Sequence, residues 1–175
     1  MIIIRKLQPN ESAIYREIRF TCLKNAAENF GSTYEEEILN PKLKFETFIE
    51  NASTEHFMFG VFDVDKLIGI TGFDRMNRKR DRHRGELVQV YLDSNHRGQN
   101  IGEKLIRSVV EYAFTMGGLE QIQLSVVAGN KSAIKLYEKI GFRSYGLQPH
   151  YFKVNDTYMD QNFMQLFKSD YQGYC

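Results

Sequence analysis

The sequence predicts one domain of mixed α and β structure. Short apolar runs bounded by turn residues alternate along the chain with segments whose apolar residues recur at helical spacing. A chain of 175 residues is long enough for one sizeable core and short for two domains. No internal repeat, low-complexity stretch or Pro/Gly-rich linker divides it, so we expect residues 1–175 to form a single domain.

Seven strands and four helices are expected, in the order β-α-α-β-β-β-α-β-α-β-β. The helix near residues 10–27 has Asn10 or Ser12 as its expected N-cap. The third helix ends at Gly117-Gly118 and the fourth at Gly141, because glycine favours the end of a helix. The other expected helices cover 45–51, 101–117 and 132–140, and the strands cover 2–7, 57–63, 67–73, 86–92, 121–127, 142–154 and 157–167.

Composition narrows the classes of partner and the compartment. A formal net charge of +1 provides no basic field for a nucleic acid. No apolar run approaches the ~18 residues of a membrane span, and the N-terminal charges follow a short apolar run, which is not the order of a secretory signal. Cys22 and Cys175 lack metal-ligand spacing. We therefore expect free thiols, no metal and a cytoplasmic location.

The segment around Arg97 is the most informative part of the chain. The apolar strand at 87–92 leads through a short polar turn into a Gly-containing loop and then an amphipathic helix. This arrangement aims several backbone N–H groups and the positive end of a helix dipole at one small volume. It predicts a site for a phosphate or pyrophosphate, and the short, Arg-led loop favours coenzyme A over a dinucleotide.

A second motif lies at 130–142, where Asn130 precedes a predicted helix that contains Tyr137. Seven helical residues turn through about 700°, so these two side chains share a face. They are candidates for one binding site. The alternative is that Asn130 is a plain N-cap and that Tyr137 belongs to the core.

These two motifs and the element order resemble the GNAT superfamily of acyl-CoA-dependent N-acetyltransferases over residues 2–167. Arg97 and Gly102 fill the first and last positions of the family's loop pattern Gln/Arg-x-x-Gly-x-Gly/Ala. Asn100 replaces the middle glycine, and because Asn tolerates positive φ we expect it to keep the loop's shape. Residues 130–142 match Asn-x-x-Ala-x-x-x-Tyr-x-x-x-Gly-Phe. The resemblance implies a mixed, mostly antiparallel twisted sheet of about seven strands flanked by about four helices.

The resemblance also implies acetyl-CoA as acetyl donor and assigns roles to residues. Asn130 would bond the pantetheine arm, and Tyr137 would lie near the sulfur as the general acid. Glu86, eleven residues before Arg97, would be the general base. Alternatively, Glu86 forms a structural salt bridge with the neighbouring basic loop, and a water chain serves as the base. The expected cofactor-binding residues are Val90, Tyr91, Leu92, Arg97, Gly98, Gln99, Asn100, Ile101, Gly102, Glu103, Asn130, Ser132 and Tyr137.

The implied reaction is direct attack of a primary amine, from a small molecule or a peptide, in a ternary complex. No cysteine falls in a motif, which weighs against an acetyl-enzyme. Tyr34, Glu35 and Glu36 are candidates to receive the cationic amine, with an ordinary acidic loop as the alternative. A polyamine, an aminoglycoside-like drug, an amino acid and a protein N-terminus all remain open as acceptors.

Other interpretations concern partners. A non-catalytic acyl-CoA-binding sensor or interaction module is the main rival to the enzyme; a nucleotide-binding regulator lacks the Walker lysine and Gly-x-Gly-x-x-Gly patterns. The basic loop is either an anion landing site or, more simply, a solvated loop. Aromatic residues in the last two strands favour a homodimer, with core packing as the alternative. The basic residues are Arg75, Arg78, Lys79, Arg80, Arg82 and Arg84; the aromatic ones are Tyr145, Tyr151, Phe152, Tyr158, Phe163 and Phe167.

Overall fold

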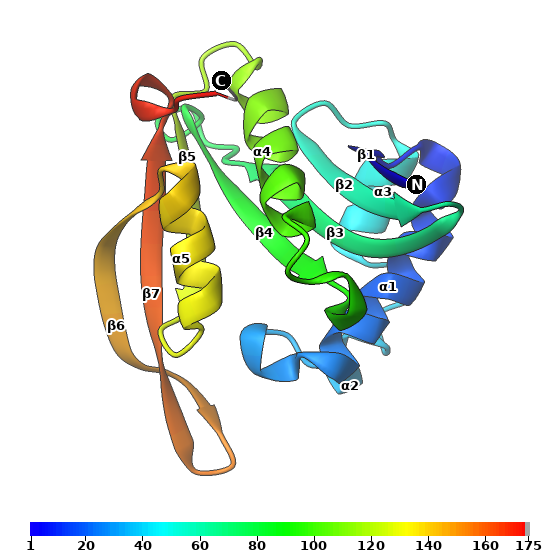
Figure 1. Cartoon of the computed structure of the whole chain (residues 1–175), viewed down its shortest axis with the longest axis horizontal. Helices are drawn as coiled ribbons and strands as arrows, with labels where there is room; N and C mark the ends of the chain where they lie inside the picture. Colours follow the sequence, from blue (N-terminus) through cyan, green and yellow to red (C-terminus); the bar gives the residue numbers. More distant parts are fainter. Residues whose placement is uncertain (174–175) are drawn as a thin grey trace.

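A single seven-stranded sheet organises the molecule (Figure 1). The computed structural model describes residues 1–173, so Cys175 lies outside the described residues. The strands are β1 (Ile2–Lys6), β2 (His56–Asp63), β3 (Lys66–Arg75), β4 (Arg84–Leu92), β5 (Gln121–Val127), β6 (Arg143–Val154) and β7 (Thr157–Phe167). They lie in the order β1-β2-β3-β4-β5-β7-β6, and β4–β5 is the parallel pair in an otherwise antiparallel sheet. The expected mostly antiparallel sheet is confirmed.

Helices cover both faces of the sheet. They are α1 (Ser12–Asn25), α2 (Tyr34–Glu37), α3 (Lys44–Glu50), α4 (Ile101–Phe114) and α5 (Lys131–Ile140). One buried cluster joins α4 and α5 to alternate residues of the strands, among them Leu87 and Ile122. A second cluster, which includes Met58 and Ile70, joins α1 and α3 to the opposite face of β2, β3 and β4. Successive side chains of each strand therefore point to opposite faces of the sheet, which is the period-2 pattern from which the strands were predicted.

Two details near the N-terminus differ from the sequence prediction. The helix α1 has Glu11 at its N-cap position without a side-chain cap, because a short 3₁₀ turn, Pro9–Glu11, precedes it. Neither Asn10 nor Ser12 is therefore the cap. The acidic segment after Thr33 forms the one-turn helix α2, closed by a capping box between Thr33 and Glu36.

The β6–β7 hairpin leaves much of its aromatic surface uncovered. Strand β6 lies at an edge of the sheet and is exposed along most of its length. Tyr145, Tyr151, Tyr158 and Phe167 are exposed, so core packing does not account for them. Figure 1 shows this hairpin extending beyond the helices. Within residues 1–173, no helix is long and apolar enough to cross a membrane.

Candidate active site

The site begins where β4 and β5 separate. These parallel strands pair only from Arg84 with Gln121 to Glu86 with Gln123. Beyond Glu86, the described part of the chain offers the inner edge of β4 no strand partner, so backbone N–H and C=O groups near Val90 face an opening. An unpaired strand edge of this kind can bond an extended ligand.

A β-bulge helps to turn β4 toward this opening. Val88 pairs with Gly72 but Tyr91 pairs with Ile70, so β4 has one extra residue. Gln89 takes up the extra length with a φ of 55°. Its side-chain oxygen accepts a hydrogen bond of 3.0 Å from the hydroxyl of Tyr15 on α1. The sequence prediction missed this bulge, because a glutamine at positive φ has no sequence signature.

The loop from β4 to α4 has the backbone shape expected of an anion cradle. Gly98 and Asn100 have φ values of 75° and 58°. The prediction that Asn100 tolerates this conformation in place of glycine is confirmed. Asn100 stands at the N-cap of α4 without a side-chain cap bond, so the first N–H groups of the helix remain available to a ligand.

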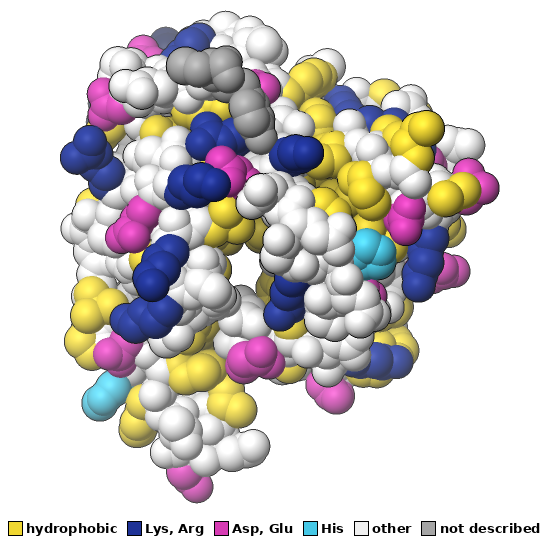
Figure 2. Space-filling view, in the orientation of Figure 1, with side chains coloured by type: hydrophobic (Ala, Val, Ile, Leu, Met, Phe, Trp, Pro, Cys, Tyr) yellow, Lys and Arg dark blue, Asp and Glu magenta, His cyan; other side chains and the backbone are white. Residues whose placement is uncertain are grey.

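A cavity of about 1190 Å³ occupies the opening between the strands. Figure 2 shows it as a gap near the middle of the molecule, with basic side chains on both sides. Every expected cofactor-binding residue except Gln99 lines it. The side chain of Tyr91 is buried in the cluster on the α1–α3 face, from which Ala26 and Phe45 also line the cavity.

Gly102 fits a ligand that approaches closely. A Cβ atom there would meet only the Cδ2 of Leu136, at 3.6 Å, which is an ordinary contact. The position also lies in the first turn of α4, where positive φ is not required. The fold alone therefore does not demand glycine, whereas a phosphate bound at the helix N-terminus would.

Asn130 has the capping role that was its alternative interpretation. Its side-chain oxygen accepts from the N–H of Ala133 at 3.2 Å and from the hydroxyl of Ser132 at 3.1 Å. Its amide nitrogen donates to the side-chain oxygen of Asn29 at 2.8 Å. Asn29 belongs to the segment after α1, so this bond joins the two halves of the molecule across the cavity. Sequence reasoning did not find this partner, since 101 residues separate the two positions.

Tyr137 lines the cavity and contributes its ring to the core, so its core interpretation is confirmed, while its role toward the cofactor stays a prediction. The ring centroid lies 5.9 Å from that of Phe142. Among the described residues, the hydroxyl has no hydrogen-bond partner. Burial raises the pKa of Tyr137 well above its ordinary value, so the hydroxyl keeps its proton through neutral pH.

Glu86 lines the same cavity and is half-buried. It forms no ion pair with the basic loop in the described residues, which removes that alternative. Burial raises the pKa of its carboxyl above the ordinary value, and the neighbouring Asp74 raises it further, while Lys44 acts in the opposite direction. A carboxylate with a raised pKa is better suited to accept a proton near neutral pH.

The wall on the acceptor side is built differently from the sequence prediction. Tyr34, Glu35 and Glu36 do not line the cavity; Tyr34 packs edge-on against Phe20, with ring centroids 5.4 Å apart. Glu37, from the same short helix, lines the cavity instead. The correction follows from α2, since its helical turn directs Glu37 inward. The other lining residues that the sequence did not reveal include Glu28, Phe30, Phe152 and Gln161.

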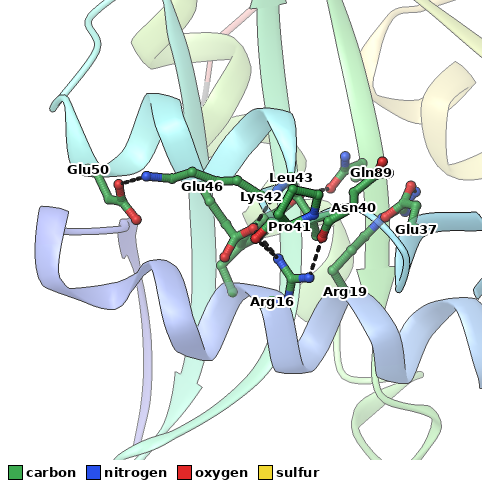
Figure 3. Close-up of polar contacts among 11 residues, drawn as sticks. Arg16, Arg19, Glu37, Asn40, Pro41, Lys42, Leu43, Glu46, Glu50 and Gln89 are labelled. Carbon is green, nitrogen blue, oxygen red and sulfur yellow. Dashed lines mark hydrogen bonds and ion pairs between the residues drawn. The ribbon is translucent and has the colours of Figure 1, made fainter.

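Ion pairs and hydrogen bonds hold the segment from Glu37 to Glu46 against α1. Arg19 is buried and donates to both oxygens of Glu37, at 2.9 and 2.5 Å. Arg16 donates to Glu46 at 2.7 Å and to the backbone oxygen of Asn40 at 2.6 Å. Figure 3 shows both arginines reaching from α1 toward the segment that contains these partners. The wall is therefore pre-formed, because charge-assisted and bidentate bonds fix its geometry.

The basic loop lies apart from the cavity. None of its six described arginines and lysines lines the cavity. Arg75 is buried and donates to the backbone oxygens of Arg82 and Gly117 and to Glu55. Arg78 pairs with Asp81. These contacts agree with the simpler interpretation, a loop held and solvated without a ligand.

Comparison with known proteins identifies the family. A family model described as an acetyltransferase (GNAT) domain matches residues 4–163. The chain belongs to the GNAT acetyltransferase family. This GNAT chain is 32% identical over 114 residues to a spermidine N(1)-acetyltransferase of Vibrio cholerae serotype O1. That match covers 65% of this chain and 64% of the relative, so the chain spans less than two thirds of the relative's length.

Solved GNAT structures share the fold. A GNAT-family acetyltransferase from Streptococcus pneumoniae has a TM-score of 0.78 at 24% identity, over 95% of this chain and 99% of that one. A putative acetyltransferase from Salmonella typhimurium, solved with its cofactor acetyl-CoA, has a TM-score of 0.78 at 17% identity, over 100% and 98% of the two chains. At these identities the likeness concerns the fold, which confirms the architecture inferred from the motifs.

Proposed function

We propose that this chain is an N-acetyltransferase that moves an acetyl group from acetyl-CoA to a primary amine by direct attack in a ternary complex. One observation supports this most strongly: a single cavity contains the anion cradle at 97–103, the unpaired edge of β4, and both Glu86 and Tyr137. A cofactor site without chemistry would need the first two features only. Membership of the GNAT family supports the same reaction.

In this proposal, backbone groups hold the cofactor. The N–H groups at the start of α4 bind the pyrophosphate, with Arg97 beside them. The unpaired edge of β4 near Val90 and Leu92 bonds the pantetheine amides as an additional strand would. A backbone N–H of that edge also stabilises the charge that develops on the acetyl oxygen. Acetyl-CoA supplies the activated acetyl group.

Glu86 and Tyr137 move the protons. A lysine-like amine has a pKa of about 10.4 and must lose a proton before it attacks. Glu86, whose carboxyl has a raised pKa, takes that proton directly or through water. Tyr137 retains its own proton at neutral pH and acts as the general acid: it gives this proton to the departing thiolate and regains one from the nitrogen of the newly acetylated amine. The proposed base, Glu86, and the proposed acid, Tyr137, thus line the same cavity.

Direct attack is favoured over an acetyl-enzyme. Within residues 1–173 no cysteine lines the cavity, and Cys22 on α1 is buried in the cluster that joins α1 and α3 to the sheet. Burial raises the pKa of the Cys22 thiol to about 11, so it remains protonated and unreactive at neutral pH. The free thiol supports a reducing compartment, and we place the protein in the cytoplasm.

The acceptor is an amine from a small molecule or a peptide. The Vibrio cholerae relative is named for spermidine, which supports a polyamine. Glu28, Glu37 and Glu86 supply carboxylates around the cavity, although Arg19 already pairs with Glu37. An amino acid, an aminoglycoside-like drug and a protein N-terminus remain alternatives.

A panel of these amines tests the proposal against an acyl-CoA sensor. Release of free coenzyme A thiol is followed with and without each amine, and the acceptor is analysed by mass spectrometry. We expect amine-dependent thiol release and one acetyl group added to the acceptor. Binding of acetyl-CoA without amine-dependent release, across the whole panel, would favour the sensor.

A further inference from the structure

A row of polar side chains crosses the sheet at the level of Glu86. In the strand register, His56 of β2 pairs with Asp74 of β3, Asp74 pairs with Glu86 of β4, and Glu86 pairs with Gln123 of β5. Directly paired residues point to the same face, with Cβ atoms about 4.5–5.5 Å apart in antiparallel pairs. This face is the one that α3 covers over β2 and β3.

Asp74 stands at the centre of this row and is held from two sides. One carboxylate oxygen lies 2.6 Å from the Nδ1 atom of His56. The other forms an ion pair with the ammonium of Lys44, at the start of α3. The ring of His56 is in turn stacked on Phe48, with centroids 4.4 Å apart. Asp74 therefore has little freedom to move relative to Glu86.

Lys44 connects this group to the cavity. It lines the cavity with Glu86 while its ammonium bonds Asp74. Glu86 thus has a negative neighbour on β3 and a positive neighbour on α3. Its neighbour on β5, Gln123, is neutral and lies 3.4 Å from an Nη atom of Arg84, which precedes Glu86 on its own strand. Among the described residues, Asp74 and Lys44 are the charged groups that act on the carboxyl of Glu86.

We propose that Lys44 and Asp74 are positioning residues that set the protonation of Glu86 through opposed charges, with His56 anchoring Asp74. The inference rests on the proposed role of Glu86 as base. Asp74 keeps the carboxyl basic enough to take the proton of the amine. Lys44 limits that effect, so that Glu86 is still ionised when the amine arrives. The two residues form an ion pair, yet they act on Glu86 with opposite sign.

The opposition of signs provides the test. Removing the negative charge with Asp74→Asn makes ionised Glu86 more favourable, so the acidic limb of the rate-versus-pH profile moves to lower pH. Removing the positive charge with Lys44→Gln makes it less favourable, so the limb moves to higher pH. Each shift should be about one pH unit, typical of a neighbouring charge. If the ion pair were merely structural, both variants would break it and change the enzyme in the same direction.

Matched controls separate charge from local damage. Lys42→Gln removes the same charge two residues away, where Lys42 pairs with Glu50 on the surface, and should leave the limb unchanged. Lys44→Arg keeps the charge and should retain the wild-type limb. The side chain of Lys44 is 61% exposed, so its variants are expected to fold even if Asp74→Asn does not.

A titration without turnover distinguishes this inference from the proposed function. The side-chain carboxyl of Glu86 is followed by ¹³C NMR against pH in the free wild type, Asp74→Asn and Lys44→Gln. Opposite shifts of its pKa support the inference; no shift in Lys44→Gln, or shifts of one sign, overturn it. If the NMR shifts are opposite but the acidic limb does not follow them, the charge coupling holds and the role of Glu86 as base fails.

Discussion

Replacing Tyr137 with phenylalanine separates chemistry from folding. The substitution deletes one hydroxyl and keeps the ring that packs against Phe142 with centroids 5.9 Å apart. Among the described residues that hydroxyl has no hydrogen-bond partner, so no bond within the protein is lost. Tyr137 lines the cavity, so losing a hydroxyl that has no bond within the protein is close to neutral, and we expect the free energy of unfolding to change by less than about 0.5 kcal/mol.

The effect of Tyr137→Phe on turnover should be much larger. A general acid contributes about 10²-fold or more to the rate, which corresponds to about 2.7 kcal/mol of barrier. We expect kcat to fall by this factor while the affinity for acetyl-CoA stays nearly unchanged. The expected rise in the activation barrier is thus several times larger than the expected change in the free energy of unfolding.

Three measurements check this separation. Initial rates of thiol release give kcat, calorimetry gives the coenzyme affinity, and urea unfolding gives stability. The control is Tyr112→Phe on α4, which removes a hydroxyl outside the cavity from a ring that packs against Phe57 at 4.8 Å. If Tyr137→Phe turned over like the wild type, or like Tyr112→Phe, Tyr137 would be a core residue only.

Three further predictions follow from the site. Wild-type protein should bind acetyl-CoA with a dissociation constant in the micromolar range, a binding free energy of about 8 kcal/mol. Calorimetry should show weaker binding for Gly102→Ala, without loss of thermal stability, and no binding for Gly102→Glu. Equal affinity of wild type and Gly102→Glu would contradict the proposed phosphate site. The rate-versus-pH profile should have an acidic limb above the ordinary glutamate range, because the raised pKa of Glu86 keeps it protonated at low pH, and Glu86→Gln should abolish that limb. A limb that persists would assign the base to a water chain or another carboxylate. The exposed aromatic surface of the β6–β7 hairpin should form a homodimer interface, and sedimentation of a monomer at tens of micromolar would exclude it.

Local patterns predicted most of the architecture. Strand β5 has the expected limits, 121–127, because its alternating apolar residues and flanking turn residues identify it without reference to the rest of the chain. The same holds for the loop at Asn100, since its positive φ follows from the tolerance of a single residue type. Helix α4 ends at Phe114, before Gly117, because a turn separates it from the glycine at positive φ, Gly118.

Features that depend on distant partners were not predictable. The bulge at Gln89 is stabilised by Tyr15, and the bond between Asn130 and Asn29 joins segments far apart in the chain. The row through Asp74 and Glu86 exists only once the register of the strands is known. In contrast, the capping box at Thr33 and Glu36 is visible in the sequence as Thr-x-x-Glu, and it would have placed the start of α2.

A crystal structure with bound coenzyme A tests the central claim most directly. We predict that the pyrophosphate lies at the N-terminus of α4 against Gly102, that the pantetheine pairs with β4 beyond Gln89, and that the sulfur lies between Glu86 and Tyr137. Coenzyme A bound elsewhere on the surface, or bound in the cavity with its sulfur out of reach of both side chains, would contradict the account.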